Sequence, residues 1–392
     1  MKKLKNVRLG IVGIGGMGSG HARLVQSGKA PGLTLAAVCD ERPERKEAFP
    51  DVPFFTDPAA LFGSGAVDAV LIATPHYSHT TLGAAALAAG LHTLVEKPIS
   101  VHKTDAEKLI AAHQDKQVVF AAMFNQRTDP RYVKLKQLLD QGELGAIQRV
   151  SWNITDWYRT EAYYASGGWR ATWSGEGGGV LLNQCPHQLD LLQWLFGMPQ
   201  KVRAFCQFGR FHEIEVEDAV TAHLEYASGA TATFITTTGE TPGVNRLEVA
   251  ADRGLVVIEG EGLRFIRNER PASEHRRTDP GMFSRPVVWN VEIPTSGRGE
   301  QHTGILKNFA DAILKDAPLI APAAEGIRSV ELANAMLYSG WREETVALPL
   351  DGTAYAGWLA ERIRSSKPRK APAAAAPASA SAADMSQSFG KR

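Results

Sequence analysis

The sequence predicts an α/β protein of two domains, in which a doubly wound parallel sheet is followed by an α+β domain on a large open, mainly antiparallel sheet. Between Val7 and Phe124, short apolar runs alternate with helical segments, which is the pattern of parallel strands joined by crossover helices. After about residue 146 the runs become β-rich and are separated by turns, as in an antiparallel sheet. A chain of 392 residues is long enough for two hydrophobic cores.

Apolar periodicity predicts the elements of the first domain. The expected strands are Val7–Val12, Thr34–Val38, Ala69–Ala73, His92–Val95 and Val118–Ala122. A helix is expected over Thr80–Ala89, because this segment is rich in alanine and leucine and stops at Gly90. Another helix is expected over Asp105–His113.

The second domain is expected to begin with a helix over Pro130–Gln141, followed by a glycine turn and a strand over Ala146–Asn153. Further strands are expected at Lys201–Phe208, Ala219–Tyr226, Thr231–Thr238, Asn245–Ala250, Leu255–Glu259 and Leu263–Arg267, and helices at Gly304–Leu314 and Glu325–Ser339. We therefore expect domains over residues 1–125 and 126–364, with the C-terminal helices either in the second domain or packed back on the first. Residues 365–392 are rich in Ala, Pro and Ser and are expected to be disordered.

One face of the second sheet is expected to be small and polar. The segment Thr231–Thr238 carries several threonines, while Ala232 and Phe234 indicate an apolar face. Such an open face needs cover, which either a second copy of the chain or the chain's own helices would supply. A homo-oligomer, as a dimer or tetramer, is therefore one of two expectations.

Composition restricts the partners and the compartment. Lysine and arginine number 43 against 42 acidic residues, so nothing in the net charge of +1 attracts nucleic acid or an anionic membrane. Cys39, Cys185 and Cys206 have no metal-ligand spacing and form no disulfide framework, which suits a reducing cytoplasm. The first apolar run is interrupted by glycines and by His21, so neither a signal peptide nor a membrane span is expected.

Gly13, Gly15 and Gly18 form G-x-G-x-x-G between an apolar strand and a helical pattern. In such a loop the first glycine allows a tight turn, the second admits a pyrophosphate against bare backbone, and the third lets helix and strand pack closely. The alternative is a glycine-rich structural turn. The loop residues expected at a dinucleotide are Gly13, Gly15, Gly16, Met17 and Gly18.

Asp40 ends the second apolar run, at the spacing of the acidic residue that binds the adenosine ribose. A carboxylate there repels a 2′-phosphate, which favours NAD over NADP. Arg42 and Arg45 lie nearby and would instead attract such a phosphate, although Arg42 equally suits stacking on adenine or facing solvent.

Glu96-Lys97-Pro98-Ile99 follows the apolar run that ends at Val95, and ligands of open parallel sheets bind at the carboxyl ends of strands. Partial burial and the charge of an oxidised nicotinamide would both lower the pKa of Lys97, so that proton exchange with a hydroxyl becomes feasible near neutrality. The alternative is an ordinary surface lysine beside a glutamate.

Gly177-Gly178-Gly179 leads into a helical pattern in which Asn183 and His187 are four residues apart and share a face. A neutral imidazole can pass a proton or hold a substrate hydroxyl, and an amide can orient it. A histidine on an apolar helix is more often a core residue, but the glycines and Asn183 favour a site. Asp190 either orients His187 or pairs with a nearby arginine.

Together these motifs resemble the glucose-fructose oxidoreductase, inositol dehydrogenase and rhizopine-catabolism (Gfo/Idh/MocA) family. The resemblance rests on the glycine fingerprint, Thr74-Pro75-His76, Glu96-Lys97-Pro98 and the glycine triplet before His187, and it covers about residues 6–350. It implies a Rossmann domain, an α+β domain whose open sheet often mediates association, and hydride transfer between NAD(P) and a carbinol carbon of a sugar, polyol or glycoside.

The resemblance also implies site residues. The family's lysine matches Lys97 and its histidine matches His187, whereas its usual aspartate is here Asn183, which cannot relay a proton. Some branches of the family carry asparagine there. Expected at the cofactor are Thr74, Pro75, His76, Glu96, Lys97, Asn125, Trp169 and Arg170; expected at the substrate are Lys97, Asn125, Arg127, Tyr158, Tyr163, Asn183 and His187. No metal is expected, because His76 and His79 lack a carboxylate in metal-site spacing.

The sequence thus predicts an NAD-dependent dehydrogenase in which Lys97 removes the proton of a sugar hydroxyl and His187 holds or relays it. One alternative is an NAD-dependent glycosidase that oxidises its substrate transiently and eliminates the aglycone. A third is a non-catalytic NAD-binding sensor, which the exchange to Asn183 and the C-terminal tail would suit.

Overall fold

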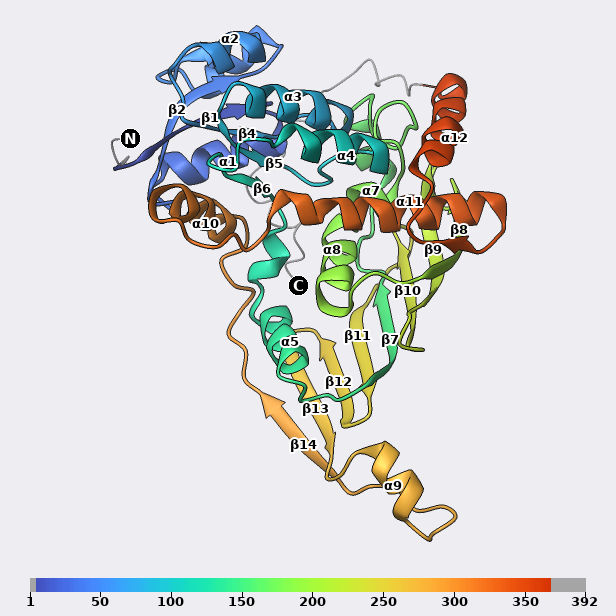
Figure 1. The fold of residues 1–392 in the computed structure, drawn as a ribbon. Helices are drawn as coiled ribbons and strands as arrows, with labels where there is room; N and C mark the ends of the chain where they lie inside the picture. The colour runs from blue at the N-terminus through green and yellow to red at the C-terminus, as the bar shows by residue number, and fades with distance from the viewer. Residues whose placement is uncertain (1–4, 368–392) are drawn as a thin grey trace.

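The computed structural model describes residues 5–367, and the part of the expected tail from residue 368 onward lies outside the described residues. Figure 1 shows a smaller sheet formed by the N-terminal part of the chain and a larger sheet formed by the C-terminal part. The long helix α11 (Gly326–Arg342) runs from the first sheet toward the far edge of the second.

The first sheet has six strands in the order β3-β2-β1-β4-β5-β6, and all its pairs are parallel. The strands are β1 (Val7–Val12), β2 (Leu33–Cys39), β3 (Phe54–Phe55), β4 (Ala69–Ile72), β5 (His92–Val95) and β6 (Phe120–Ala122). They are joined by α1 (Gly16–Gln26), the 3-10 turn η1 (Pro43–Ala48), α2 (Pro58–Gly63), α3 (His76–Ala88) and α4 (Lys103–Ala112). From β1 the chain adds strands toward one edge of the sheet, and from β4 it adds them toward the other edge. In Rossmann folds the ligand binds at this switch point, beyond the carboxyl ends of the two strands.

Some elements of this sheet differ from the sequence prediction. Helix α3 begins at His76 rather than at Thr80, with Pro75 in the N-cap position. Strand β3 has only two residues, which is too short for periodicity to indicate. Helix α2 is short as well, but Asp57 caps it by accepting hydrogen bonds from the amides of Ala59 and Ala60.

The second sheet has nine strands in the order β14-β13-β12-β11-β7-β10-β9-β8-β15. Only β7 and β10 pair in parallel, and every other pair of this sheet is antiparallel. The strands are β7 (Ile147–Ile154), β8 (Lys201–Phe208), β9 (Glu217–Glu225), β10 (Thr231–Thr237), β11 (Asn245–Ala251), β12 (Gly254–Glu259), β13 (Gly262–Asn268), β14 (Val288–Ile293) and β15 (Val346–Ala347). The two edge strands, β14 and β15, are additions to the predicted set.

Helices line the side of this sheet that faces the first one (Figure 1). The chain also forms α9 (Ala272–Thr278), beyond the ends of β13 and β14, α10 (Gln301–Lys315), which packs on the first sheet, and the 3-10 turns η2 (Asn125–Thr128) and η3 (Ala323–Glu325). The helices on this side of the second sheet include α5 (Pro130–Asp140), α6 (Glu161–Ala165), α7 (Val180–Asn183), α8 (Pro186–Phe196) and α12 (Gly352–Ser365). Trp152 and Phe234 point to this side and are fully buried. The sheet and these helices therefore share one hydrophobic core.

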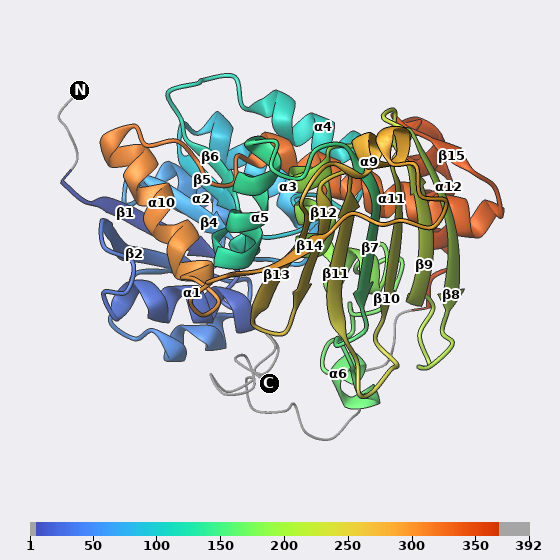
Figure 2. The ribbon, with the colours of Figure 1, turned by 90° about the horizontal axis from the view of Figure 1, so that it is seen from below.

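The opposite side of the second sheet carries the small polar residues that the sequence predicts. In Figure 2 the strands β7 to β11 lie in front, with no helix across their middle. Thr233 lies on this side, where Ser151, Asn153, Arg246 and Glu248 surround it. Within the described residues, the chain's own helices cover the other side, so this face stays open to a partner.

Helix α10 belongs to the core of the first sheet although it follows the second in sequence. Its residues Ile305 and Phe309 are buried among the side chains of β1 and β2. Figure 1 shows α10 beside these strands, on the side away from α2. A helix that follows the second sheet in sequence thus packs back on the N-terminal sheet.

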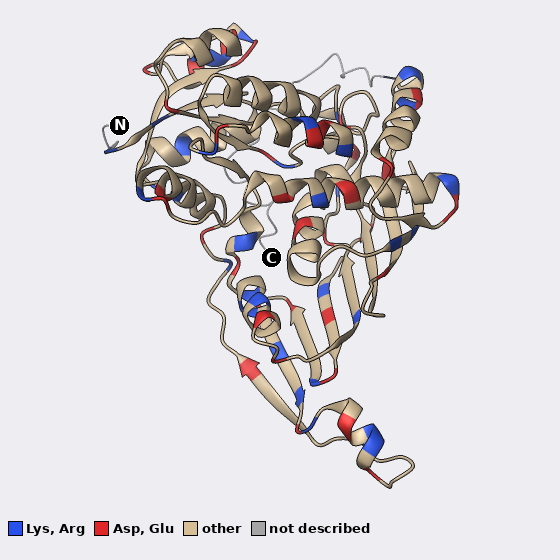
Figure 3. Ribbon diagram, in the orientation of Figure 1, with Lys and Arg blue, Asp and Glu red and all other residues tan. Residues whose placement is uncertain are grey.

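Charged side chains of both signs are interspersed over the described chain (Figure 3). Such mixing agrees with the near-zero net charge. Among the described helices, none is both long enough and apolar enough to cross a bilayer.

Candidate active site between the two sheets

The glycine loop between β1 and α1 leaves no room for side chains. Gly13 has φ of +85°, and a Cβ on it would lie 2.8 Å from the carbonyl oxygen of Ala73. A Cβ on Gly18 would lie 1.9 Å from the carbonyl oxygen of Gly13. Gly16 and Met17 begin α1, whose N-terminal amides and dipole favour a phosphate. The bare backbone of this cradle therefore fits a dinucleotide pyrophosphate.

Asp40 lies beside this cradle, at the end of β2. Its Oδ2 accepts a hydrogen bond from the amide of Ile14 at 3.1 Å, and its Oδ1 accepts one from the amide of Arg42 at 3.1 Å. Arg45 Nη1 approaches Oδ2 at 3.3 Å, and Arg42 Nε approaches Oδ1 at 3.5 Å. The carboxylate thus lies beside the glycine loop and contacts both nearby arginines.

Two turns at the carboxyl ends of β4 and β5 are joined by one buried histidine. His79 places Nε2 2.7 Å from the carbonyl oxygen of Thr74 and Nδ1 2.8 Å from that of Pro98. His76, at the start of α3, lies edge-on to the ring of Trp169 with the ring centres 5.7 Å apart. The Thr74-Pro75-His76 turn, the turn that carries Lys97 and the ring of Trp169 therefore lie together at the carboxyl ends of β4 and β5.

Lys97 is the central cation of the crevice. Its Nζ donates a hydrogen bond of 2.8 Å to the backbone carbonyl of Asn183, which comes from the other sheet's helices. Burial lowers the pKa of Lys97, although the charges of Glu96 and Glu176 partly oppose this. A lysine in this setting is closer to the neutral form than a surface lysine.

The helix that carries Asn183 and His187 is interrupted, which corrects the prediction of one continuous helix. Helix α7 ends at Asn183 and α8 begins at Pro186, because proline supplies no amide hydrogen and fits only the first turn of a helix. In an unbroken helix the carbonyl of Asn183 would accept the amide of His187. The interruption leaves this carbonyl to Lys97.

The side chain of Asn183 is held in one orientation by its neighbours. Its Nδ2 donates to Glu176 Oε1, and its Oδ1 accepts from the hydroxyl of Tyr163 at 3.1 Å. The same hydroxyl accepts from Arg170 Nη1 at 3.1 Å. Glu176 is fully buried, and burial raises its pKa. Asn183, Tyr163 and Arg170 are thus brought together with Lys97.

His187 lies at the same place with both ring nitrogens unpaired. It is 4% exposed, and neither Nδ1 nor Nε2 has a hydrogen-bond partner among the described residues. Burial lowers its pKa well below the ordinary value, and the charge of Lys97 lowers it further. Asn125 Oδ1 and Gln188 Oε1 are also buried without a partner. Buried polar atoms are rarely left unpaired, so these groups fit the polar atoms of a ligand.

Glu96, which the sequence prediction assigns only to the cofactor, is part of a buried cluster next to Lys97. Its Oε1 lies 2.7 Å from His21 Nε2, and its Oε2 accepts the amide of Lys97 at 3.0 Å. Burial opposes ionisation of Glu96, but the hydrogen bond from His21 lowers its pKa to about 2. His302, from α10, packs edge-on to His21 at 5.4 Å. The cluster therefore fixes the backbone of the Lys97 turn.

Two residues expected at the substrate have other surroundings. Arg127 is nearly fully buried. Its Nε and Nη2, which form one edge of the guanidinium, each donate to Asp190 at 2.7 Å, and its Nη1 binds Glu325. Of the two alternatives for Asp190, the structure therefore shows the pairing with an arginine. Tyr158 is 47% exposed, and its carbonyl accepts a hydrogen bond from Arg159.

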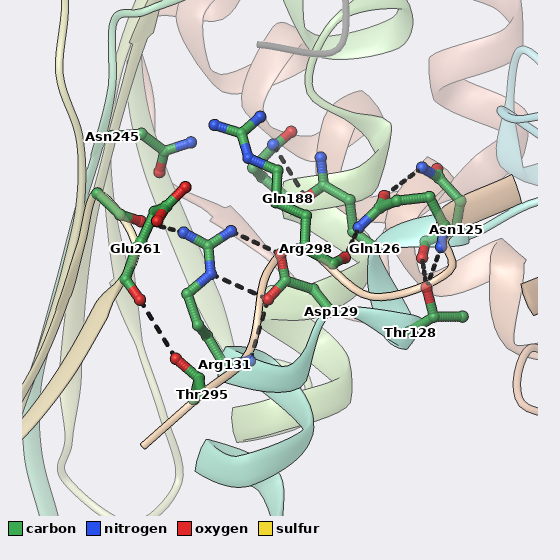
Figure 4. Close-up of polar contacts among 12 residues, drawn as sticks. Asn125, Gln126, Thr128, Asp129, Arg131, Gln188, Asn245, Glu261, Thr295 and Arg298 are labelled. Atoms are coloured by element: carbon green, nitrogen blue, oxygen red, sulfur yellow. Dashed lines mark hydrogen bonds and ion pairs between the residues drawn. The ribbon is translucent and has the colours of Figure 1, made fainter. Parts of the chain in front are cut away.

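Polar side chains that include Gln188, Gln126 and Arg131 form contacts beside the strands of the second sheet (Figure 4). Gln188 Nε2 donates to Gln126 Oε1 at 3.2 Å, and Arg131 binds Asp129 through Nε at 2.9 Å. Figure 4 shows the side chain of Arg298 extending past Gln188 in the direction of the sheet. This network gives the far end of the crevice hydrogen-bonding groups of the kind that bind a polyhydroxylated molecule.

Comparison with known proteins agrees with this geometry. The family model described as "Oxidoreductase family, NAD-binding Rossmann fold" matches residues 7–124, and that of the GFO/IDH/MocA C-terminal domain matches residues 132–257. Together the two matches span more than half of the chain. They divide it at the same place as the two sheets.

Individual relatives include inositol 2-dehydrogenase 1 of Saccharopolyspora erythraea, 37% identical over 36% of this chain and 43% of that protein. The match thus spans less than half of that relative's length. Inositol 2-dehydrogenase of Rhizobium meliloti is 26% identical over 85% of this chain and 96% of its own. The WlbA dehydrogenase of Bordetella pertussis, solved in complex with NADH and UDP-GlcNAcA, is 25% identical with a TM-score of 0.74, covering 88% of this chain and 100% of that one. The chain is therefore a member of the GFO/IDH/MocA family of oxidoreductases, with an NAD-binding Rossmann domain.

Proposed function

We propose that this protein is an NAD-dependent dehydrogenase that transfers hydride between nicotinamide and a carbinol carbon of a sugar, cyclitol or glycoside. The proposal depends on one observation, the meeting of Lys97 from β5 with Asn183 and His187 from the helices of the second sheet. Lys97 and Asn183 are half-buried and hydrogen-bonded, whereas His187 is buried with both ring nitrogens unpaired among the described residues. Lys97 follows the carboxyl end of a parallel strand, where ligands of such sheets bind.

The chemistry follows from the states of these side chains. A bound nicotinamide supplies the hydride acceptor at C4, a capacity that no side chain has. Lys97 in its neutral form accepts the proton of the substrate hydroxyl while the C–H electron pair leaves as hydride. The resulting ammonium is then held by the carbonyl of Asn183. His187 is neutral, because burial and the Lys97 charge lower its pKa, so it can hold or relay that proton.

Substrate class and cofactor choice are supported separately. The relatives are described as inositol 2-dehydrogenases, and the WlbA structure holds UDP-GlcNAcA, so a carbohydrate-like substrate fits the family. Asp40 favours NAD, because its carboxylate would repel the 2′-phosphate of NADP. The open face of the second sheet supports a homo-oligomer, since the chain's own described helices leave it uncovered.

A substrate panel tests the proposal. Sugars, inositols and glycosides are assayed with NAD and with NADP, and the absorbance of the reduced cofactor is followed. We expect steady NADH formation with at least one member and its loss in Lys97→Met, while NADH still binds. Aglycone release without net NADH would indicate the glycosidase alternative instead. Tight NAD binding with no turnover across the panel would favour a sensor.

A further inference from the structure

Arg159 is held rigidly at the edge of the crevice. Its amide donates to the carbonyl of Thr238 at 2.9 Å, and its own carbonyl lies 2.9 Å from His212 Nε2. Its guanidinium lies over the ring of Trp157 at 5.4 Å and over that of Tyr163 at 5.0 Å. Backbone hydrogen bonds and stacking therefore fix both the position and the plane of the guanidinium.

The hydrogen-bonding edge of this guanidinium is unused. Arg159 Nη1 donates to the carbonyl of Tyr158 at 2.9 Å, whereas Nε is buried without a partner among the described residues. Arg170, on the other side of Tyr163, has Glu176 at 3.9 Å, but no carboxylate in the described chain forms such a pair with Arg159. The edge formed by Nε and Nη2 matches the two oxygens of a carboxylate, which it binds through parallel hydrogen bonds.

Tyr163 lies between Arg159 and the proposed reaction centre at Lys97. The Tyr163 hydroxyl donates to Asn183, whose carbonyl holds Lys97. Burial lowers the pKa of Lys97, and the charges of Arg170 and Arg159 lower it further, so all three cations act on one another. A ligand that contacts Lys97 at one end is therefore within reach of Arg159 at the other.

The acidic groups nearby are already engaged. Glu96 binds His21, and Glu176 is a buried carboxyl whose pKa burial raises. Asp156 is within electrostatic reach of Arg159 but also of Arg298. An oxidised nicotinamide would add a further positive charge beside Lys97. A hydroxyl of a neutral sugar would offer this edge a neutral acceptor, whereas a carboxylate would pair with Nε and Nη2 through two stronger, charge-assisted hydrogen bonds.

We infer that the substrate is an acidic sugar, and that Arg159 binds its carboxylate while Lys97 contacts the hydroxyl that is oxidised. This inference rests on the proposed function and narrows its substrate class. It assigns Arg159 a direct contact with substrate. The cofactor site, which lies at the glycine loop and Asp40, is a separate part of the crevice.

Matched sugars test the inference, with D-glucuronate against D-glucose and D-galacturonate against D-galactose. Binding to the NADH-loaded protein is measured by calorimetry at two salt concentrations, and NAD reduction is measured in parallel. Each acid is expected to bind about 10- to 100-fold more tightly than its neutral partner, the range of a charge-assisted hydrogen-bond pair. In Arg159→Met the ratio should fall toward one, and Arg159→Lys should recover only part of it. Arg210→Met is the matched control, because Arg210 also stacks on an aromatic ring, at 5.4 Å from that of Phe211, but is exposed.

The outcomes separate this inference from the proposed function. Turnover of neutral sugars or inositols without any preference for acids would overturn the inference and leave the dehydrogenase intact. Arg159-dependent binding of an acid without NAD reduction by any sugar would support the carboxylate site and overturn the dehydrogenase. Failure of every acid to bind, or tighter binding of glucose 6-phosphate than of glucuronate, would also refute a carboxylate site.

Discussion

The Nζ atom of Lys97 lies 2.8 Å from the backbone carbonyl oxygen of Asn183, so a strand end of one sheet is joined to a helix end of the other. The bond exists because Pro186 ends the helical hydrogen-bond pattern just after Asn183. The carbonyl accepts a stronger, charge-assisted hydrogen bond from the ammonium form than from the neutral amine. The contact thus favours the protonated product of the proposed step, while burial favours the neutral base.

The pH dependence of turnover should report this lysine. Burial lowers its pKa below the ordinary 10.5, so kcat/KM for oxidation should rise with pH and level off at a lower pH than an ordinary lysine would give. Reduction of the ketone needs the protonated form, and its rate should fall as pH rises through the same pKa. Lys97→Arg stays charged and should lower kcat about 100- to 10,000-fold. Lys108→Arg, on an exposed helix surface, serves as control, and a plateau only above pH 10 would contradict the assignment.

Asp40 should set the cofactor preference. Asp40→Ser removes the carboxylate that holds Arg42 and Arg45, which then become available to a 2′-phosphate. We expect the ratio of kcat/KM for NAD to that for NADP to fall at least tenfold. Glu41→Gln is the control, because it removes an adjacent exposed charge. An unchanged ratio in Asp40→Ser would show that this carboxylate does not select the cofactor.

Arg127 should act on stability rather than on substrate binding. Its pairing with Asp190 is fully buried, and removing one member of a buried ion pair commonly costs about 3–5 kcal/mol of unfolding free energy. We expect this loss in Arg127→Met by urea unfolding, and partial recovery when Asp190→Leu is added. Arg246→Met, which breaks exposed ion pairs, should cost less than about 1 kcal/mol. A stable Arg127→Met with a raised KM would instead restore the substrate role that the resemblance implies.

The sequence is enough to predict the parts of the site that are local motifs. The glycine loop and Lys97 each follow a buried strand, so their position at the carboxyl edge of the sheet follows from the strand pattern. Pro186 was the available signal for the helix interruption, since proline disfavours the helical conformation in the residue before it. Helical spacing without this signal predicts one helix for Asn183 and His187, whereas the structure has two.

Supporting residues from distant segments could not be predicted in this way. His21 and His302 are brought to Glu96 only by the packing of α1 and α10 on the first sheet. Glu176 precedes the glycine triplet, but nothing local shows that it holds Asn183. Strand β14 also escapes periodicity, because it is an edge strand with mostly exposed side chains on both faces. These contacts depend on the tertiary fold, which a single sequence pattern does not encode.

Glu217, which binds the backbone at the end of the glycine triplet, should make the free energy of unfolding depend on pH. Its carboxylate accepts the amides of Gly179 at 2.7 Å and Leu181 at 2.9 Å, and a Cβ on Gly179 would meet its carbonyl oxygen. Burial raises its pKa from 4.5 to about 7 despite these amides. A raised pKa in the folded state means that its contribution to stability is complete below pH 4.5 and is lost as pH rises to about 7, a change on the order of 3 kcal/mol.

Glu217→Gln tests this directly, since an amide keeps the shape but does not titrate. The variant should be less stable than the parent at pH 4.5. The reason is that the side-chain NH2 group of glutamine, a donor, would face a backbone N–H that donates to a carboxyl oxygen in the parent. The gap in unfolding free energy should then narrow steadily up to about pH 7 and stay constant above it. Glu225→Gln, at the exposed end of the same strand, should show no such trend. Parallel stability curves for Glu217→Gln and the parent protein would mean that Glu217 titrates equally in the folded and unfolded states.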